Sequence, residues 1–300
     1  MLTLLAPAKL NLTLEVLAKR PDGFHEICSV IQAINLCDRY RFHLSQSLTF
    51  KCDEPKWLPE KSLVSKAATL LRDTTGCSKG ATIEINKRIP LVSGLGGDSS
   101  DAAAILRGLN RLWDLGLPPP ELVRLASQLG SDVAFFLYGG MALAKGIGEI
   151  VTPLPSLPRK WVVLIDPPVP EITNKTGRLY AAIKSEHYTR GQVTDRLVAV
   201  LNSGGEVTPS MLFNVFESVA WDMFDRLGEY REQFLKAGAE SVHLAGSGPT
   251  LFTPAKDRVQ ADKIHQNLQQ QGVESYLAET LDAIDQVTET AYNNNKGGIK

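Results

Sequence analysis

The sequence predicts an α+β protein of two domains, and three observations support this class. The first fifty or so residues alternate between apolar and polar side chains with the period of half-buried strands. The spacing changes to that of helices at 62–76 and again after the glycine-rich stretch near residue 97. A breaker-rich stretch, TPLPSLPRK at 152–160, then precedes segments in the order β-α-α-β-β-α-β, which is typical of an antiparallel sheet backed by helices.

Composition restricts the kind of protein further. Of the 300 residues, 43% are hydrophobic and 22% charged, as in ordinary globular proteins, and the net charge of −1 gives no sign of a nucleic-acid partner. No apolar run reaches the roughly 18 residues that cross a bilayer, and the start MLTLLAPAKLNL lacks the charged region of a signal peptide. Four cysteines without Cys-x-x-Cys spacing indicate free thiols in a reducing compartment. We therefore expect a cytoplasmic protein with no membrane partner.

The clearest strand pattern lies at residues 9–16. The even positions carry Leu10, Leu12, Leu14 and Val16, and the odd positions carry Lys9, Asn11, Thr13 and Glu15. This alternation predicts one face on a core and the other toward solvent or a ligand. The turn residues Pro21-Asp22-Gly23 follow, so the next apolar run, 27–36, is expected to complete an antiparallel hairpin.

Further elements follow from the same patterns. The first domain should contain strands at 39–44, 47–52, 81–90, 141–146 and 148–154, and helices at 62–76, at 118–130 and from a cap at Ser99 or Ser100. The second domain should contain strands at 161–168, 241–246, 250–254 and 273–279, and helices at 173–183, 213–238 and 258–272. We place the domains at 1–157 and 158–285, followed by a polar tail at 286–300 that is predicted to be disordered.

Three glycines, Gly94, Gly96 and Gly97, lie between a predicted strand and a predicted helix. Such a loop exposes backbone N–H groups, and the helix start adds partial positive charge, so the arrangement suits a phosphate. Asp98 stands where a P-loop needs lysine, and Ser99 stands where a dinucleotide loop needs its third glycine. The residues alone leave two interpretations open, namely a phosphate site or a glycine turn whose acidic residues cap the next helix.

Several stretches resemble one family. GLGGDSSDAA at 94–103 resembles the second motif of the GHMP small-molecule kinases, and GSGPTLF at 246–252 resembles their third. PAKLNLTLEV at 7–16, RPDGFHEI at 20–27 and LGSDVAFFLYGG at 129–140 resemble the branch that phosphorylates the 2-hydroxyl group of 4-diphosphocytidyl-2-C-methyl-D-erythritol, in the non-mevalonate isoprenoid pathway. The resemblance runs from about residue 2 to residue 282.

The resemblance implies a fold, a reaction and partners. The fold would be an N-terminal domain like the second domain of ribosomal protein S5 followed by a ferredoxin-like C-terminal domain, with the active site between them. The reaction would be in-line phosphoryl transfer, with ATP and Mg²⁺ as cofactors and the cytidyl compound as the small-molecule substrate. We expect a monomer or a weak homodimer. Two other functions stay open, namely a GHMP kinase with another substrate and a nucleotide-binding relative without turnover.

Lys9 and Asp132 are the catalytic residues that the resemblance implies. Spacing alone favours plainer roles, with Asp132 as the N-cap of a helix at 133–137 and Lys9 as a solvated strand lysine. In the family, the aspartate acts as base or orienting group for the acceptor hydroxyl, and the lysine reaches both. A cation within about 4–6 Å would keep the carboxylate ionised and offset transition-state charge.

The resemblance also implies binding residues. For the substrate these are Asn11, Phe24, His25, Lys145, Thr173, Gly246, Ser247 and Gly248, with cytosine held by the aromatic ring and the histidine. Phe24 stands where tyrosine is usual and keeps the stacking surface without the hydroxyl. For ATP they are Lys87, Pro90, Leu91, Val92, Ser93, Gly94, Leu95, Gly96, Gly97, Asp98, Ser99 and Ser100.

Asp98 is the main departure from the family motif, since it replaces the usual third glycine. Its side chain either caps the helix, leaving only backbone near the phosphates, or binds Mg²⁺ directly or through water. Asp101 is expected to cap the same helix. Ser62 and Val215 also differ from the residues that the family usually has there. The ligands of the metal stay open.

Overall fold

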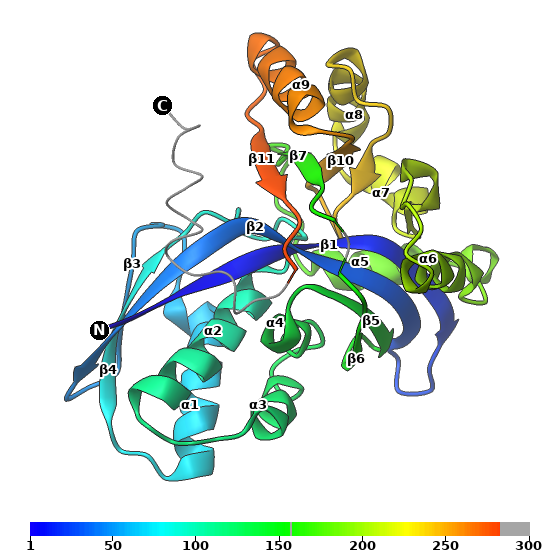
Figure 1. The fold of residues 1–300 in the computed structure, drawn as a ribbon. Coiled ribbons are helices and arrows are strands. Elements are labelled where there is room, and N and C mark those ends of the chain that lie inside the picture. Colours follow the sequence, from blue (N-terminus) through cyan, green and yellow to red (C-terminus); the bar gives the residue numbers. More distant parts are fainter. Residues whose placement is uncertain (157, 283–300) are drawn as a thin grey trace.

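The computed structural model describes residues 1–156 and 158–282, and the predicted tail at 286–300 lies outside them. Figure 1 shows the long strands β1 and β2 crossing the molecule, with helices α1 to α4 on one side and a second, smaller sheet on the other. Within the described residues, no helix is both long and apolar enough to cross a membrane. The predicted α+β class is confirmed, with two sheets and their helices.

The first sheet has the strand order β3-β4-β2-β1-β8, with β5 beside β2 and β6 beside β5. Its strands are β1 (Leu2–Lys19), β2 (His25–Ser45), β3 (Thr49–Cys52), β4 (Gly80–Asn86), β5 (Met141–Gly146), β6 (Ile150–Pro153) and β8 (Phe213–Asn214). The strands predicted at 27–36 and 39–44 are one continuous strand, β2, because a bulge between Ile34 and Cys37 lets the pairing with β1 continue.

The predicted hairpin turn between β1 and β2 is confirmed. Gly23 has a φ of 89°, a left-handed conformation that glycine adopts without steric cost. The backbone N–H of Phe24 donates to the Asp22 carboxylate over 3.0 Å. The turn therefore places Phe24 directly before β2 and His25 as its first residue.

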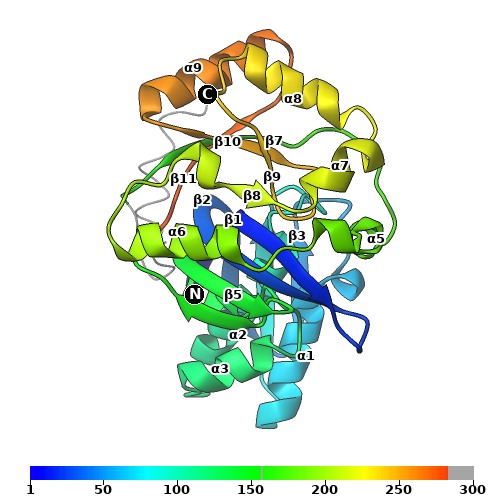
Figure 2. The same ribbon diagram turned by 90° about the vertical axis from the view of Figure 1, so that its right-hand side faces the viewer.

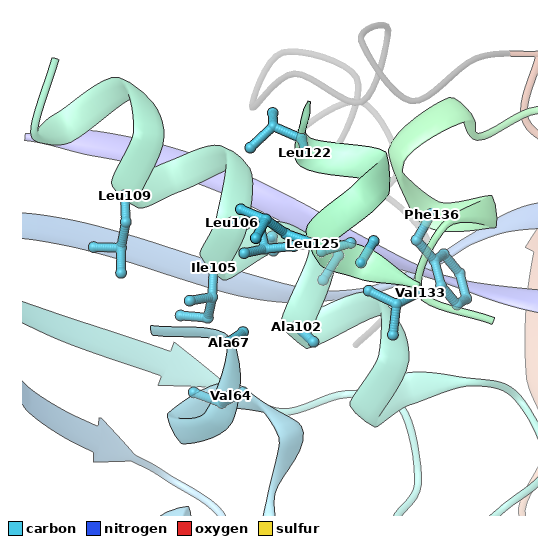
Figure 3. Packing of buried hydrophobic residues seen from close by; sticks show 14 of the residues in the cluster. Val64, Ala67, Ala102, Ile105, Leu106, Leu109, Leu122, Leu125, Val133 and Phe136 are labelled. Carbon is cyan, nitrogen blue, oxygen red and sulfur yellow. The ribbon is translucent and has the colours of Figure 1, made fainter. Parts of the chain in front are cut away.

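Four helices cover one face of this sheet and bury its main core. They are α1 (Leu63–Thr75), α2 (Gly97–Leu112), α3 (Pro119–Ala126) and α4 (Phe135–Tyr138), and a 3-10 turn, Pro59–Lys61, precedes α1. Figure 3 shows Ala67 of α1, Ile105 of α2 and Leu125 of α3 within one packed cluster, and all three are almost fully buried. Burying such side chains contributes about 1.5–3 kcal/mol each to folding for the larger ones.

The helix boundaries differ from the expected ones at two places in the first half. α2 begins at Gly97 instead of after a serine cap, because the left-handed Gly96 (φ 74°) already turns the chain into the helix. Ser99 and Ser100 therefore lie inside its first turn. α3 ends at Ala126, four residues before the predicted Gly130, and the chain continues in tight turns.

The second sheet is antiparallel in the order β11-β7-β10-β9. Its strands are β7 (Trp161–Ile165), β9 (His243–Leu244), β10 (Leu251–Ala255) and β11 (Tyr276–Glu279). The helices of this half are α5 (Lys175–Ala182), α6 (Gln192–Asn202), α7 (Glu217–Met223), α8 (Leu227–Lys236) and α9 (Arg258–Gln270), with 3-10 turns at Ser185–His187 and Pro209–Met211. Figure 2 shows α8 and α9 on the side of this sheet that faces away from the first sheet.

Two parts of this half differ from the predicted order. The single helix expected at 213–238 is three elements, β8, α7 and α8, since Phe213 and Asn214 pair in parallel with β1 instead of continuing a helix. The helix α6 was not expected at all. A buried carboxylate of β1 satisfies its first turn: the backbone N–H of Thr194 donates to the Glu15 carboxylate over 2.7 Å.

The polar face of β1 is consequently not a solvated one. Thr13 and Glu15 are fully buried beneath α6, and the Thr194 hydroxyl donates to the Thr13 hydroxyl over 2.9 Å. Lys9 and Asn11, further along the same face, are 5% and 6% exposed. The alternating pattern therefore marks two buried faces. The apolar side chains Leu10, Leu14 and Val16 pack in clusters shared with the second half of the chain and not in the α1–α4 core.

A tight contact between α2 and β2 makes Gly108 sensitive to substitution. A Cβ at Gly108 would lie 2.2 Å from Cζ of Phe42, so Gly108→Ala should lower the free energy of unfolding by about 1–3 kcal/mol through overpacking. Gly228→Ala in α8 is the matched control, because no atom lies within 4 Å of its Cβ position, and we expect a gain of about 0.5–1 kcal/mol from helix propensity. Urea unfolding followed by circular dichroism measures both, and equal effects would contradict the packing argument.

Candidate active site

A cleft of about 1350 Å³ opens between the glycine loop, the start of β1, the hairpin turn and the second half of the chain. Most of the predicted site residues line it, namely Lys9, Asn11, Phe24, His25, Lys87, Pro90, Leu91, Val92, Ser93, Gly94, Gly96, Gly97, Asp98, Ser99, Asp132, Gly246 and Ser247. Segments far apart in the chain therefore meet at one site.

Five predicted residues are not part of this lining. Leu95 and Ser100 point into the core beneath the loop and are 1% exposed each. Gly248 lies behind the glycine turn, where its carbonyl accepts from Lys175. Lys145 sits on the exposed side of β5, and Thr173 precedes α5, whose first turn instead brings Thr176 to the cleft.

The floor of the cleft carries a lysine, an asparagine and an aspartate in contact. Lys9 Nζ lies 3.4 Å from the Asp132 carboxylate and donates to Asn11 Oδ1 over 2.6 Å. Asp132 is not a helix cap, because α4 begins only at Phe135 and no side chain caps it. Its side chain keeps 32% of its surface exposed, so the carboxylate is open to a molecule in the cleft.

Hydrogen bonds within the sheet hold this group in place. The backbone N–H of Lys9 donates to the Leu95 carbonyl over 2.9 Å, which ties β1 to the glycine loop. The Asn11 amide donates to the Ser29 hydroxyl over 2.8 Å. With its amide and carbonyl ends both engaged, Asn11 has a fixed orientation, and Lys9 is aimed at Asp132.

An aromatic pocket lies at the other end of the cleft. His25 stacks on Tyr180 of α5 with ring centroids 4.8 Å apart, and Tyr188 meets the histidine edge-on at 6.4 Å. Burial, and then the charge of Lys19, lower the pKa of His25, so the imidazole is neutral near pH 7 and can both donate and accept. Phe24 is 58% exposed and offers a free ring face beside it.

Tyr180 belongs to this pocket and was not predicted. Its ring packs edge-on against Phe216, with centroids 4.9 Å apart, and burial, followed by the charge of Asp132, raises its pKa to about 12. The hydroxyl therefore stays protonated at any physiological pH. No local pattern in TNKTGRLYAAI distinguishes this tyrosine from a core residue, because its role depends on contact with β2.

The glycine loop packs directly against the glycine turn of the second half. A Cβ at Gly94 would lie 2.2 Å from the Ala245 carbonyl oxygen, and one at Gly246 would lie 2.7 Å from the Gly94 carbonyl oxygen. Only glycine permits this approach. Asn214, which was also not predicted, fixes the turn by donating to the carbonyls of Leu244 and Gly246 over 2.9 and 2.8 Å.

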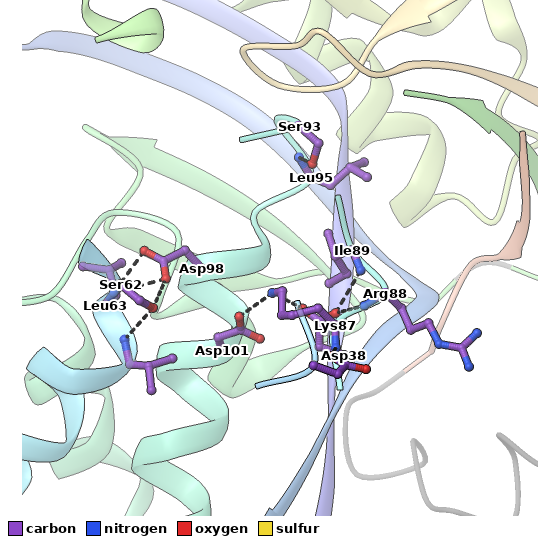
Figure 4. A network of polar contacts seen from close by, with 12 residues as sticks. Asp38, Ser62, Leu63, Lys87, Arg88, Ile89, Ser93, Leu95, Asp98 and Asp101 are labelled. Carbon is purple, nitrogen blue, oxygen red and sulfur yellow. Dashed lines mark hydrogen bonds and ion pairs between the residues drawn. The ribbon is translucent and has the colours of Figure 1, made fainter. Parts of the chain in front are cut away.

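Asp98 points away from the centre of the cleft and caps a helix, though not its own. Figure 4 shows its carboxylate at the start of α1, where it accepts the Leu63 backbone N–H over 3.1 Å and the Ser62 hydroxyl. The predicted capping of α2 by Asp98 is therefore wrong, because no side chain caps α2 and the carboxylate bonds to the start of α1 instead. The two departures from the family motif, at 62 and 98, are bonded to each other.

Lys87 lies beneath the loop between two buried carboxylates, those of Asp38 and Asp101 (Figure 4). Burial lowers the pKa of Lys87, but the charges of Asp101 and then Asp38 have the larger combined effect and raise it above its usual value. Burial and then Asp38 raise the pKa of Asp101. The expectation that Asp101 caps α2 is wrong, because its carboxylate pairs with Lys87 over 2.6 Å. In residues 1–156 and 158–282, no group of three or more His, Cys, Asp or Glu could hold a metal ion.

Comparison with known proteins identifies the family of this chain. Residues 62–140 match the model of the GHMP kinases N-terminal domain, and residues 202–274 match that of the GHMP kinases C-terminal domain. The chain belongs to the GHMP kinase family. A 4-diphosphocytidyl-2-C-methyl-D-erythritol kinase of Dehalococcoides mccartyi is 49% identical over 285 residues, which is 95% of this chain and all of that protein. The Bacillus subtilis kinase of the same name is 38% identical over 88% of this chain and 91% of its own length.

Solved structures give the same result. A 4-(cytidine 5′-diphospho)-2C-methyl-D-erythritol kinase superposes with a TM-score of 0.79 at 31% identity, covering 93% of this chain and 99% of its own. A homoserine kinase from Cytophaga hutchinsonii superposes with a TM-score of 0.72, covering 94% of this chain and 95% of its own, and its 22% identity shows the fold alone. Within the GHMP kinases, this chain therefore groups with the cytidyl-methylerythritol kinases.

The contact between Ser62 and Asp98 should be visible as energetic coupling. Asp98→Ala removes a cap and should lower the free energy of unfolding by about 1 kcal/mol, and a double-mutant cycle with Ser62→Ala should give a coupling of about 0.5–3 kcal/mol. ATP affinity at saturating Mg²⁺ should stay unchanged in Asp98→Ala, because the carboxylate faces α1. Independent effects in the cycle, or a lost Mg²⁺ dependence of ATP binding, would contradict the capping role.

Proposed function

We propose that this chain is an ATP-dependent kinase that phosphorylates the 2-hydroxyl group of 4-diphosphocytidyl-2-C-methyl-D-erythritol. One observation carries the proposal: Lys9 and Asp132 meet on the floor of a cleft that has a glycine loop at one side and an aromatic–histidine pocket at the other. Relatives at 49% and 38% identity bear the name of this enzyme, over nearly their whole lengths. The reaction would belong to the non-mevalonate route to isoprenoid precursors.

The glycine loop would hold the ATP phosphates. Residues 93–97 lead into α2, so their backbone N–H groups and the partial positive charge of the helix start lie together at the cleft. Lys87 supports the loop from below through the paired carboxylates of Asp38 and Asp101. Because the Asp98 carboxylate bonds to the start of α1, the phosphates would meet the backbone of the glycine loop and not this side chain.

Asp132 and Lys9 would act at the acceptor hydroxyl. Phosphoryl transfer needs a positioned hydroxyl in line with the transferring group and positive charge where negative charge develops. We propose that the Asp132 carboxylate accepts or orients the hydroxyl proton. Lys9 would hold that carboxylate in place and offset charge on the transferring phosphoryl, because its ammonium lies 3.4 Å away and is almost fully buried.

The aromatic pocket would recognise cytosine. The free ring face of Phe24 offers a stacking surface, Tyr180 closes the opposite side of His25, and the neutral imidazole can bond a base edge. A substrate without a base would have no use for these groups. This pocket therefore favours the cytidyl compound over homoserine, mevalonate or a sugar.

Mg²⁺ would enter with ATP. It would supply positive charge to the phosphates when bound. The carboxylates nearest the loop are committed to other partners, Asp98 to α1 and Asp101 to Lys87. Asp132 and the hydroxyl of Ser99 are among the other oxygen donors that line the cleft. We propose that the metal is held mainly by the nucleotide.

The remaining parts of the proposal concern organisation. We propose domains at 1–157 and 158–285, a cytoplasmic location, and a monomer or weak homodimer. The four cysteines are free in the structure, as expected for a reducing compartment. The chain from β7 onward builds the second sheet, although β8 joins the first.

Turnover tests this function directly. Purified protein with ATP and Mg²⁺ should release ADP with the cytidyl substrate and not with homoserine, mevalonate or galactose. Asp132→Asn and Lys9→Ala should each lower kcat by about 10²- to 10⁴-fold, since each removes a group positioned at the reacting hydroxyl. Release with another acceptor would identify a different GHMP kinase, and bound ATP without any release would identify a non-catalytic relative.

The base pocket has a separate kinetic signature. Phe24→Ala and Tyr180→Ala should raise KM for the cytidyl substrate by about 5- to 150-fold, the range that one stacked base contributes, with KM for ATP unchanged. Phe24→Tyr is the matched control, because it keeps the ring, and should behave like the parent. Steady-state kinetics with each substrate varied in turn decides the matter, and equal rises in both KM values would speak against a base pocket.

A further inference from the structure

Lys175, the first residue of α5, reaches across the cleft to both glycine turns. Its side chain is 7% exposed, and its Nζ donates to the Val92 carbonyl over 2.7 Å and to the Gly248 carbonyl. One ammonium from the second half of the chain therefore joins the glycine loop of the first half to the glycine turn of the second.

The bond to Val92 fixes an unusual piece of backbone. Val92 has a φ of 55°, in the left-handed region that a β-branched residue rarely enters. Such a conformation costs of order 1–3 kcal/mol and persists only where the surroundings hold it. Lys175 is the side chain that holds the Val92 carbonyl, two residues before Gly94, so it shapes the loop at its entrance.

The charge of Lys175 is not neutralised by the contacts that it makes. Both acceptors are neutral carbonyls, and in residues 1–156 and 158–282 no carboxylate lies within ion-pair distance of its Nζ. An ammonium has three donor hydrogens, and these two carbonyls use two of them. A buried cation without an anionic partner is costly, and an anion in the adjoining cleft would relieve that cost.

We propose that Lys175 is a positioning residue for the phosphates of ATP, which holds the glycine loop and the glycine turn together and places a positive charge beside the transferring group. The inference rests on the proposed function for the identity of the nucleotide reaction. The binding of ATP itself can be measured without any turnover.

The charge state of Lys175 gives a distinguishing readout. Burial, aided by the charge of Lys9, lowers the pKa of Lys175 to about 8, while Asp166 and Glu171 act in the opposite direction. Asp132, paired with Lys9, is the other carboxylate on this side of the cleft. The ammonium is charged below that pH and loses its proton above it, so ATP affinity should fall as pH rises through 8. The fall can reach about tenfold per pH unit, since one proton is linked to binding.

The experiment is calorimetric titration of the full chain with ATP and Mg²⁺ from pH 7 to 9.5. Lys175→Met should weaken ATP binding at pH 7 by about 10- to 100-fold, the range for a lost charged hydrogen bond, and should remove the pH dependence. Lys175→Arg keeps the charge at every pH, so it should bind ATP more tightly than Lys175→Met with a flat profile. Lys263→Met, an exposed lysine of α9 outside the cleft, is the matched control and should behave like the parent.

Two results would overturn the proposal. One is parental ATP affinity in Lys175→Met, and the other is a parental protein whose ATP affinity does not change between pH 7 and 9.5. If Lys175→Met fails to fold, the pH dependence of ATP affinity in the parental protein and in Lys175→Arg still tests the proposal. ATP binding that depends on Lys175, without turnover of the cytidyl substrate, would sustain this inference and reject the proposed function, so the two can fail separately.

Discussion

The structure depends on the close approach of two glycine turns. Gly94 and Gly246 meet with no room for a Cβ on either, so the backbone of the first half touches the backbone of the second at the centre of the cleft. Three other contacts at the site hold these two turns in place. Asn214 fixes one turn, Lys175 bridges both, and the N–H of Lys9 bonds to the loop just beyond Gly94.

The second constraint is the burial of charge. Beneath the loop, Lys87 is balanced by two carboxylates and α2 is tied to β2 and β4. On the floor, Lys9 is balanced by Asp132, which stays partly open to solvent. Lys175 alone of these three lysines has only carbonyl partners among the described residues. A buried charge without an ionic partner is costly, and the ATP phosphates would supply that partner to Lys175 in the proposed site.

The sequence was sufficient where structure is determined by neighbours in the chain. Period-two alternation located β1, turn residues located its hairpin, and Gly76 ended α1 as expected. It was insufficient where a partner lies far along the chain. The first turn of α6 is satisfied by Glu15, and Asp98 caps α1 rather than α2, and no local pattern contains either pairing.

The site followed the same rule. Lys9, Asn11, His25 and Asp132 were predicted through motifs that the family shares, and the structure brings them to one cleft. Lys175 and Tyr180 were missed because they depend on where α5 begins and on which residues of β2 it meets. Thr173 lies two residues before the start of α5 and outside the lining of the cleft.

The path of the chain between the two sheets has a consequence for the independence of the halves. β8 returns to pair with β1, and after β11 the chain returns to β2, where the Leu281 N–H donates to the Ala33 carbonyl over 2.9 Å. A polypeptide cut at the breaker-rich stretch would thus leave β1 with a bare edge and β2 without its cover, and bare strand edges invite pairing between molecules. The two halves also share buried clusters, in which Leu10 packs with Val162 and Leu14 packs with Val163, so they are not separable pieces.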